Sequence, residues 1–550
     1  MELLVDLFGY LSIIVHGLVI VAQSMAIGGV LFLIFHARAT AWMLGPPGIA
    51  IVARTARIAA WSALALAVAE AATVALQGAV LTATLDITWL DAASSQFAVA
   101  ALVKTGLALC LALLLFLAGP VTPGWLALIF CAGILGTALM STHAAARVEG
   151  GAVLLALSAL HQFGAALWIG GIPCFIAALN RVDGVAAWRV VGERFSALSM
   201  IGVGCIVVSA AGLAYAYVGD IHAIYGTAYG VMTGAKVAMF AGLLALGHGN
   251  YRLIRSWNGR SKGDATRLKR FAEVEVGLGF TLFFAAASLT SVPPSVDLVH
   301  DRVTMAEIIE RNTPRPPRLV SPDRDTLALP GLQARLDADA AVSAGRRPLA
   351  FLPGSAEGPA RNAADIAWSE YNHHWSGMFV LAIGLLALLN HAGVRVARHW
   401  PVLFLGLAAF LFFRSDPEVW PLGPIGFWAS LRDVEVLQHR FFVLLTILFG
   451  VFEWRVRAFG IRTGWTPYVF PLATALGGAA LLTHSHAIEN LKEQLLIELT
   501  HTPLALAGVA AGWARWLELR LNPPGSRIAG WVWPLCFLLV GAMLILYREA

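Results

Sequence analysis

The chain has 550 residues, of which 58% are hydrophobic and 13% are charged, and its formal net charge is +5. Its mean hydropathy of +0.74 excludes a soluble globular protein. The basic excess does not indicate nucleic-acid binding, because the Lys and Arg residues lie in short loops between apolar runs, where they set orientation.

Apolar runs of about 20 residues recur along the chain, and each is long enough to cross a bilayer core of roughly 30 Å. The runs are continuous rather than alternating, so they predict helices. We therefore expect an all-α, polytopic integral membrane bundle with about 14 transmembrane helices. In chain order, these helices are expected near residues 8–36, 56–82, 97–118, 124–142, 152–179, 194–219, 229–253, 270–291, 373–391, 400–414, 433–455, 466–485, 494–517 and 530–547.

The basic residues predict how this bundle is oriented. Their clusters follow every second helix from the first to the thirteenth, with the third as the exception. By the positive-inside rule that side faces the cytoplasm, so both termini are expected on the outer side. Glu2 and Asp6 precede the first run, which is the wrong flank for a cleavable signal peptide, and we expect the first helix to be retained.

A polar, proline-rich segment interrupts the apolar pattern on the outer side. It divides the chain into an eight-helix membrane module at 1–295 and a six-helix module at 373–550. The segment 296–372 is expected to be a linker or cap between them.

Ten of the 15 histidines map to the outer side of the predicted bundle. An imidazole is costly at membrane depth unless it has a partner, and it is also the commonest protein ligand for copper, zinc and haem iron. The five cysteines all lie inside apolar runs without a CxxC pair, so they predict buried thiols rather than a thiolate site. The ten histidines are His16, His143, His161, His222, His373, His374, His439, His484, His486 and His501.

In the first module, His16, His143 and His161 are the candidate metal ligands, and Met140 adds a thioether that suits Cu(I). At 1.5 Å per residue, His161 lies about 14 Å below the start of its helix. The alternative is that each imidazole donates a hydrogen bond to a backbone carbonyl between helices.

In the second module, four predicted helices present imidazoles at one level, which fits copper or a haem b clamped between two facing histidines. The alternative is that these are unrelated polar residues at the membrane interface. The inner side offers only His36, His248, His391 and His399, which we expect at the headgroup level. The candidate ligands of the second module are His373, His374, His439, His484, His486 and His501.

Residues 130–255 carry several motifs in the order found in one known family. The motifs are Ser141-Thr-His143-Ala, His161-x6-Trp168-x-Gly170-Gly171, Arg194-Phe195-Ser196, Thr227-x-Tyr229-Gly230 with Lys236, and Leu246-Gly247-x-x-Asn250. With Ser-Val-Pro-Pro at 291–294, the first module resembles the copper resistance D (CopD) domain family. The resemblance implies a bacterial inner-membrane protein, an outer face in the periplasm, and copper movement into the cytoplasm. The second module loosely resembles copper-linked oxidase assembly factors.

The sequence thus predicts a copper-handling protein that takes copper at His16, His143 and His161 and passes it inward. Copper is the expected cargo, with a periplasmic copper chaperone and the lipid bilayer as partners and no nucleic acid. Two other hypotheses stay open, and with them the question of whether the protein is an enzyme. One is a haem b oxidoreductase that oxidises quinol or reduces cupric ion. The other is an assembly factor that holds copper for an oxidase.

Overall fold

The computed structural model describes residues 4, 7–85, 87–142, 147, 150–259, 263–298, 302–329, 362–461, 463–483 and 491–549. The regular elements in these ranges are helices, and the β pairing found there is an isolated bridge between Val419 and Ile425. The all-α prediction is therefore confirmed for the described part of the chain.

Twelve helices of the described residues are long and apolar enough to cross a membrane, so the protein is a multi-pass membrane protein. The sequence predicted about 14 spans by length and hydropathy. Two of those predictions correspond to 16-residue helices, α7 (Gly124–Leu139) and α21 (Thr466–Leu481), which are shorter than the twelve. The orientation of the termini stays a prediction.

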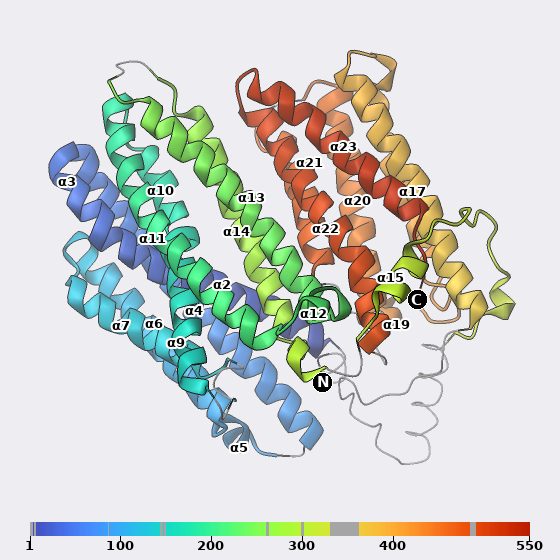
Figure 1. Cartoon of the computed structure of the whole chain (residues 1–550), viewed down its shortest axis with the longest axis horizontal. Coiled ribbons are helices and arrows are strands. Elements are labelled where there is room, and N and C mark those ends of the chain that lie inside the picture. The colour runs from blue at the N-terminus through green and yellow to red at the C-terminus, as the bar shows by residue number, and fades with distance from the viewer. Residues whose placement is uncertain are drawn as a thin grey trace. The chain divides into compact units, whose positions relative to one another are not determined.

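The chain forms two compact units (Figure 1). The first comprises Leu3–Ile221 and Lys236–Asp297, and the second comprises His222–Ala235 and Leu298–Ala550. The module boundaries predicted at 295 and 372 stay predictions. Besides α7, the helices of the first unit are α2 (Phe8–Phe32), α3 (Arg38–Leu44), α4 (Pro46–Leu85), α5 (Trp89–Ala93), α6 (Gln96–Ala118), α9 (Gly151–Ala165), α10 (Ile172–Leu179), α11 (Val185–Tyr217), most of α13 (Ala228–Ser256) and α14 (Thr266–Leu289).

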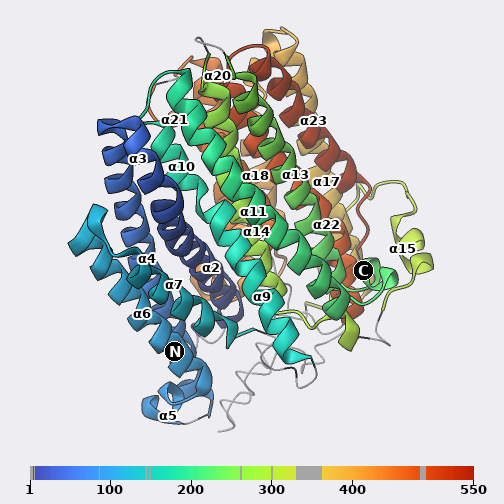
Figure 2. The ribbon, with the colours of Figure 1, turned by 60° about the vertical axis from the view of Figure 1, so that its left-hand side comes forward.

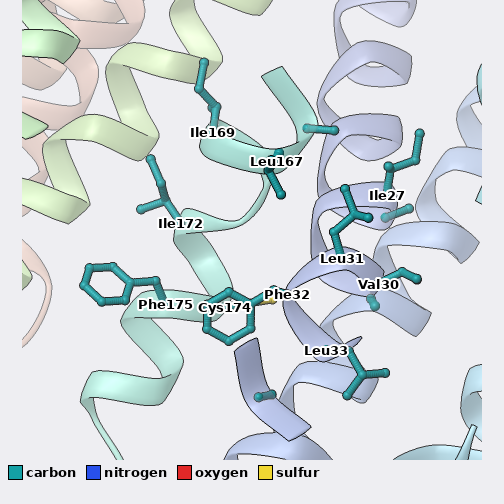
Figure 3. Packing of buried hydrophobic residues seen from close by; sticks show 14 of the residues in the cluster. Ile27, Val30, Leu31, Phe32, Leu33, Leu167, Ile169, Ile172, Cys174 and Phe175 are labelled. Carbon is teal, nitrogen blue, oxygen red and sulfur yellow. The ribbon is translucent and has the colours of Figure 1, made fainter. Parts of the chain in front are cut away.

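Helix α2 is the centre of the first unit, where it packs against α4, α7 and α14 (Figure 2). The close-up in Figure 3 shows Leu31 and Phe32 of α2 in the same apolar cluster as Leu167 and Ile172. Two π-helical turns interrupt these helices, η1 (Leu33–Ala37) after α2 and η3 (Ala166–Gly170) between α9 and α10. Such turns often mark functional positions.

Glycines allow α2 to approach η3 closely. A Cβ at Gly170 would overlap the Ser24 carbonyl, and one at Gly28 would overlap the Ala166 carbonyl. Small residues at such positions let membrane helices pack backbone to backbone.

We expect Gly170→Ala to lower the unfolding free energy of the first unit by about 3 kcal/mol, because the helices must separate to admit the methyl group. Gly136→Ala in α7 is the matched control, since its Cβ would meet nothing within 4 Å. The measurement is thermal unfolding in detergent, in which the fraction of protein that stays monodisperse is recorded at each temperature. Equal stability of the two variants would contradict this account of the contact.

The second unit has an aromatic core beside a buried charged network. The core includes Trp400, Phe404, Phe470, Trp533 and Phe537. Besides α21, the helices of this unit are α12 (Ile221–Gly226, except Ile221), α15 (Met305–Asn312), α17 (Ala363–His391), α18 (Val402–Arg414), α19 (Phe427–Ser430), α20 (Val434–Ala458), α22 (Leu491–Arg520) and α23 (Gly525–Ile545).

Four charged side chains form what we call the buried ion network: Glu453, Arg457, Arg515 and Glu518. Arg515 lies 2.8 Å from Glu453 and 2.6 Å from Glu518, and Arg457 lies 2.7 Å from Glu453. The Trp533 indole donates a hydrogen bond of 2.6 Å to Glu518. Two cations therefore balance two anions where α20, α22 and α23 meet, as a buried charge requires.

The segment 302–329 packs on the N-terminal half of α17. Arg318 donates its backbone N–H to His374 at 2.7 Å, and Trp375 donates its indole N–H to the Leu319 carbonyl at 3.2 Å. Asn362, the N-cap of α17, donates to the Thr326 carbonyl at 2.9 Å. These described residues of the predicted linker therefore cover the end of α17 that carries His373 and His374.

Candidate functional site

The structure brings His373 of α17 and His501 of α22 together. Their ring centroids are 6.0 Å apart and their planes are nearly perpendicular, at 89°. Each imidazole is fixed by its own helix, because Nδ1 of His373 lies 2.9 Å from the Ser369 carbonyl and Nδ1 of His501 lies 3.0 Å from the Ile497 carbonyl. A neutral imidazole that donates from Nδ1 carries its lone pair on Nε2, which is the usual state of a metal-bound histidine.

A third histidine and a carboxylate also interact with this pair. His439 of α20 interacts electrostatically with both His373 and His501. Its Nδ1 lies 2.7 Å from the Asp416 carboxylate, the partner that commonly orients a metal-ligating imidazole. Glu549 also acts on both imidazoles of the pair. We call His373, His501, His439 and Glu549 the histidine cluster.

The C-terminal end of the chain lines the histidine cluster. The Tyr547 ring stacks on His373 at a centroid distance of 3.9 Å and lies 5.9 Å from His501. Its hydroxyl donates a hydrogen bond of 3.1 Å to Glu549. Arg311, outside the membrane spans, also interacts with Glu549. Burial is the largest influence on Arg311 and lowers the pKa of its guanidinium, whereas Tyr547 and Glu549 act in the opposite direction.

His374 has a different role from its neighbour His373. Its Nε2 lies 2.8 Å from the Tyr547 carbonyl, and its Nδ1 accepts the Arg318 backbone N–H at 2.7 Å. Both ring nitrogens therefore bind backbone groups, so His374 joins three segments of the chain and we leave it out of the candidate ligand set.

Several candidate ligands are not placed near one another. His143, His484 and His486 lie outside the described residues. Met140 ends α7 with 51% of its surface exposed. Within the described ranges, no three His, Cys, Asp or Glu side chains are already arranged to hold a metal ion.

In the first unit, His16 and His161 are found at different depths. Gln23 of α2 donates a hydrogen bond of 2.9 Å to Gln162 of α9, which fixes how the two helices align. His16 lies seven residues before Gln23 and His161 lies one residue before Gln162. At 1.5 Å per residue, the two histidines are therefore offset by about 9 Å along the helix axes.

Each of these histidines has its own polar neighbours. His161 lies 3.1 Å from the Ser209 hydroxyl of α11, and it interacts electrostatically with Lys236 of α13. His16 interacts with Lys104 of α6, whose ammonium forms a buried ion pair with Glu70 of α4. The two imidazoles therefore occupy successive positions rather than one shared ligand set.

The first unit also contains buried polar residues that were not predicted as functional from the sequence. Glu275 of α14 is 4% exposed and accepts a hydrogen bond of 2.8 Å from Asn250 of α13. His36, expected at the headgroup level, is fully buried in η1 and lies 2.9 Å from the Val191 carbonyl. A carboxyl inside an apolar run is a sequence signal that would have singled out Glu275, since ionisable residues in membrane spans are functional by default.

The family comparison concerns a stretch that lies mostly in the first unit. Residues 189–289 match the family model described as copper resistance protein D. A relative described as copper transport protein CutJ of Bacillus subtilis (strain 168) is 30% identical over 170 residues, which is 30% of this chain. The match spans 30% of that relative's own length. No solved structure matches the chain.

The matched stretch includes α13, α14 and most of α11, and so contains Lys236, Asn250 and Glu275. The resemblance noted in the sequence of the first module is thereby confirmed: this multi-pass membrane protein contains a copper resistance protein D domain at residues 189–289.

Proposed function

We propose that the protein handles copper in the bacterial inner membrane. It binds copper at histidines near the periplasmic face and moves the ion towards the cytoplasm or to an acceptor in the membrane. The copper resistance protein D domain and the partial similarity to a copper transport protein support copper as the cargo. A periplasmic copper chaperone is the partner that would deliver it.

The observation that carries this proposal is the pairing of His373 with His501. Two imidazoles with Nδ1 fixed on carbonyl oxygens present Nε2 lone pairs, and imidazole is a good copper ligand. Glu549 supplies negative charge beside a bound cation, and His439 supplies a third imidazole. Among the described residues these ligands do not form a closed site, and a site with few ligands suits an ion that must be released again.

In this proposal the first unit contains two successive copper-binding positions, His16 and then His161. An ion that enters the membrane interior has to replace its water ligands by protein ligands. Two binding positions about 9 Å apart along the helix axes reduce the distance that the ion travels between protein ligands. His143, three residues after Met140 in the sequence, is a further candidate ligand for the entry point.

A haem b in the second unit fits the geometry less well than copper does. The Tyr547 ring stacks on His373 and reaches His501, so it occupies the space beside both imidazoles. A porphyrin between the two histidines would have to displace this ring together with the C-terminal segment. A single ion needs no such displacement.

The test is a visible spectrum of the purified protein in detergent before and after dithionite, with metal analysis of the same sample. We expect a colourless protein that binds copper in a fixed ratio. A Soret band that shifts on reduction would replace this proposal by a haem oxidoreductase. Copper binding without copper uptake in proteoliposomes would instead support an assembly factor that holds the ion.

We expect His161→Ala to weaken copper binding to the first unit by more than about 100-fold, because the ligand itself is lost and even the loss of a supporting hydrogen bond costs 10- to 100-fold. His248→Ala is the matched control, since His248 is exposed in the same unit. The measurement is copper titration of a variant whose second-unit site is removed by His373→Ala. Unchanged affinity in His161→Ala would place the site elsewhere.

A further inference from the structure

We propose that Glu275 is a proton-binding site that compensates the charge of copper as the ion crosses the first unit. The proposal rests on the copper-handling function above and names the ion that moves against copper. When Cu⁺ enters the interior from the outer side, the Glu275 carboxylic acid releases one proton to that side and becomes a carboxylate. When Cu⁺ leaves to the inner side, the carboxylate takes up one proton from there, so the net charge of the interior stays constant and one proton moves outward for each Cu⁺ that moves inward.

Glu275 lies deep in the first unit without a countercharge. It is nine residues from the start of α14, which is about 14 Å along the helix. In the described part of the chain it makes no ion pair, whereas the other deeply buried carboxylate of this unit, Glu70, is paired with Lys104. A bare carboxylate is costly in an apolar interior, and either a proton or a nearby cation removes that cost.

Two other segments hold the Glu275 carboxyl group. Asn250 of α13 donates its side-chain N–H at 2.8 Å, and Trp168 of η3 donates its indole N–H. Both donors stabilise the carboxylate, which opposes the cost of its burial. These two residues are the polar groups that reach Glu275 from the elements packed against α14 in the described residues. The carboxyl group is therefore held between its two protonation states rather than locked in one.

Asn250 can serve both protonation states. Its side-chain oxygen is buried and has no hydrogen-bond partner in the described structure. With the amide as it stands, N–H donates to the carboxylate. With the amide turned over, the oxygen accepts the O–H of the protonated acid. An apolar residue or a lysine at this position would support only one of the two states.

A single stretch of chain links Glu275's partner Trp168 to His161, the proposed copper-binding position. His161 lies seven residues before Trp168, which is about 10 Å along the helix. Trp168 is 2% exposed and packs edge-on against Phe240 of α13, so the connecting residue lies in an apolar environment. A monovalent cation held in such an interior favours loss of the Glu275 proton, because the carboxylate and the cation attract each other.

The experiment measures proton and copper movement together in proteoliposomes that contain the full chain and an entrapped pH dye. Cu⁺ is kept reduced by ascorbate and added outside. We expect wild type to move about one proton outward for each copper ion taken up, as charge balance requires. Glu275→Gln is expected to lose this coupled proton signal at least tenfold, because its amide cannot titrate. Glu275→Asp is expected to retain it, because the carboxyl group remains.

Glu273→Gln is the matched control, because Glu273 lies two residues away on the same helix and has a cationic partner, Arg270. It is expected to behave as wild type. Copper uptake by Glu275→Gln with the wild-type ratio of protons to copper would overturn the proposal. Wild-type uptake with no proton movement would overturn it as well, while leaving the copper function intact. Absence of copper uptake by wild type would instead remove the transport function itself.

Discussion

Replacement of His501 by alanine is expected to weaken copper binding in the second unit by more than about 100-fold, and His373→Ala is expected to do the same. Each imidazole supplies one nitrogen ligand, and a site with so few ligands cannot replace it. His439→Ala is expected to weaken copper binding less, by about 10- to 100-fold, because we expect its imidazole to support the pair rather than to bind the ion throughout. The measurement is competition for Cu(I) against a chelator of known affinity, with each variant in detergent.

His399→Ala is the control for these variants. His399 is an exposed histidine of the same unit and accepts a hydrogen bond of 3.1 Å from Trp454. It is expected to bind copper as wild type does. If His373→Ala and His501→Ala bind copper with wild-type affinity and stay folded, the second-unit ligands have been assigned to the wrong residues.

Replacement of Arg515 by methionine is expected to lower the unfolding free energy of the second unit by roughly 3–5 kcal/mol. Arg515 is 3% exposed and neutralises Glu453 and Glu518 from one position. Its loss leaves two carboxylates, the fully buried Glu453 and the mostly buried Glu518, with the guanidinium of Arg457. Thermal unfolding in detergent, together with proteolysis of the native state, measures the change.

A double-mutant cycle separates charge balance from packing in the buried ion network. Arg515→Met with Glu453→Met removes one cation and one anion, so the remaining pair, Arg457 and Glu518, stays balanced. We expect the double variant to be more stable than Arg515→Met alone, because a buried ion pair replaced by apolar groups is often neutral. Additive losses in the two single variants would show that the network contributes through packing instead.

The positions of the helices could be predicted from the sequence, whereas the composition of the sites could not. A run of apolar residues long enough to span lipid is a local property, so each predicted span corresponds to a helix. The predicted bounds are less accurate. Helices α7 and α21 end three and four residues before the predicted spans do, and α4 and α17 each begin ten residues before theirs, because polar residues at a helix end are not part of the apolar pattern.

The pairing of His373 with His501 depends on which helices are neighbours. The helices that carry them, α17 and α22, both pack against α23, the last helix of the chain. No local pattern in the sequence specifies that arrangement, since helix contacts in lipid depend on close fits such as that of Gly377 against the backbone of Ile545. The same limit applies to His374, which looks like a ligand in the sequence and binds backbone groups in the structure.

By itself, the sequence determined that the chain crosses the membrane many times, that its histidines gather in parts of the chain predicted to face one side, and that its first module resembles copper resistance proteins. These properties follow from the hydropathy, charge and order of residues along the chain, which do not depend on tertiary contacts. Only the tertiary structure decided that His16 and His161 lie at different depths, that Glu70 is paired and Glu275 is not, and that His373 meets His501. The physical reason is that burial, charge balance and ligand distances are properties of packed neighbours, and neighbours in a helical bundle come from remote parts of the chain.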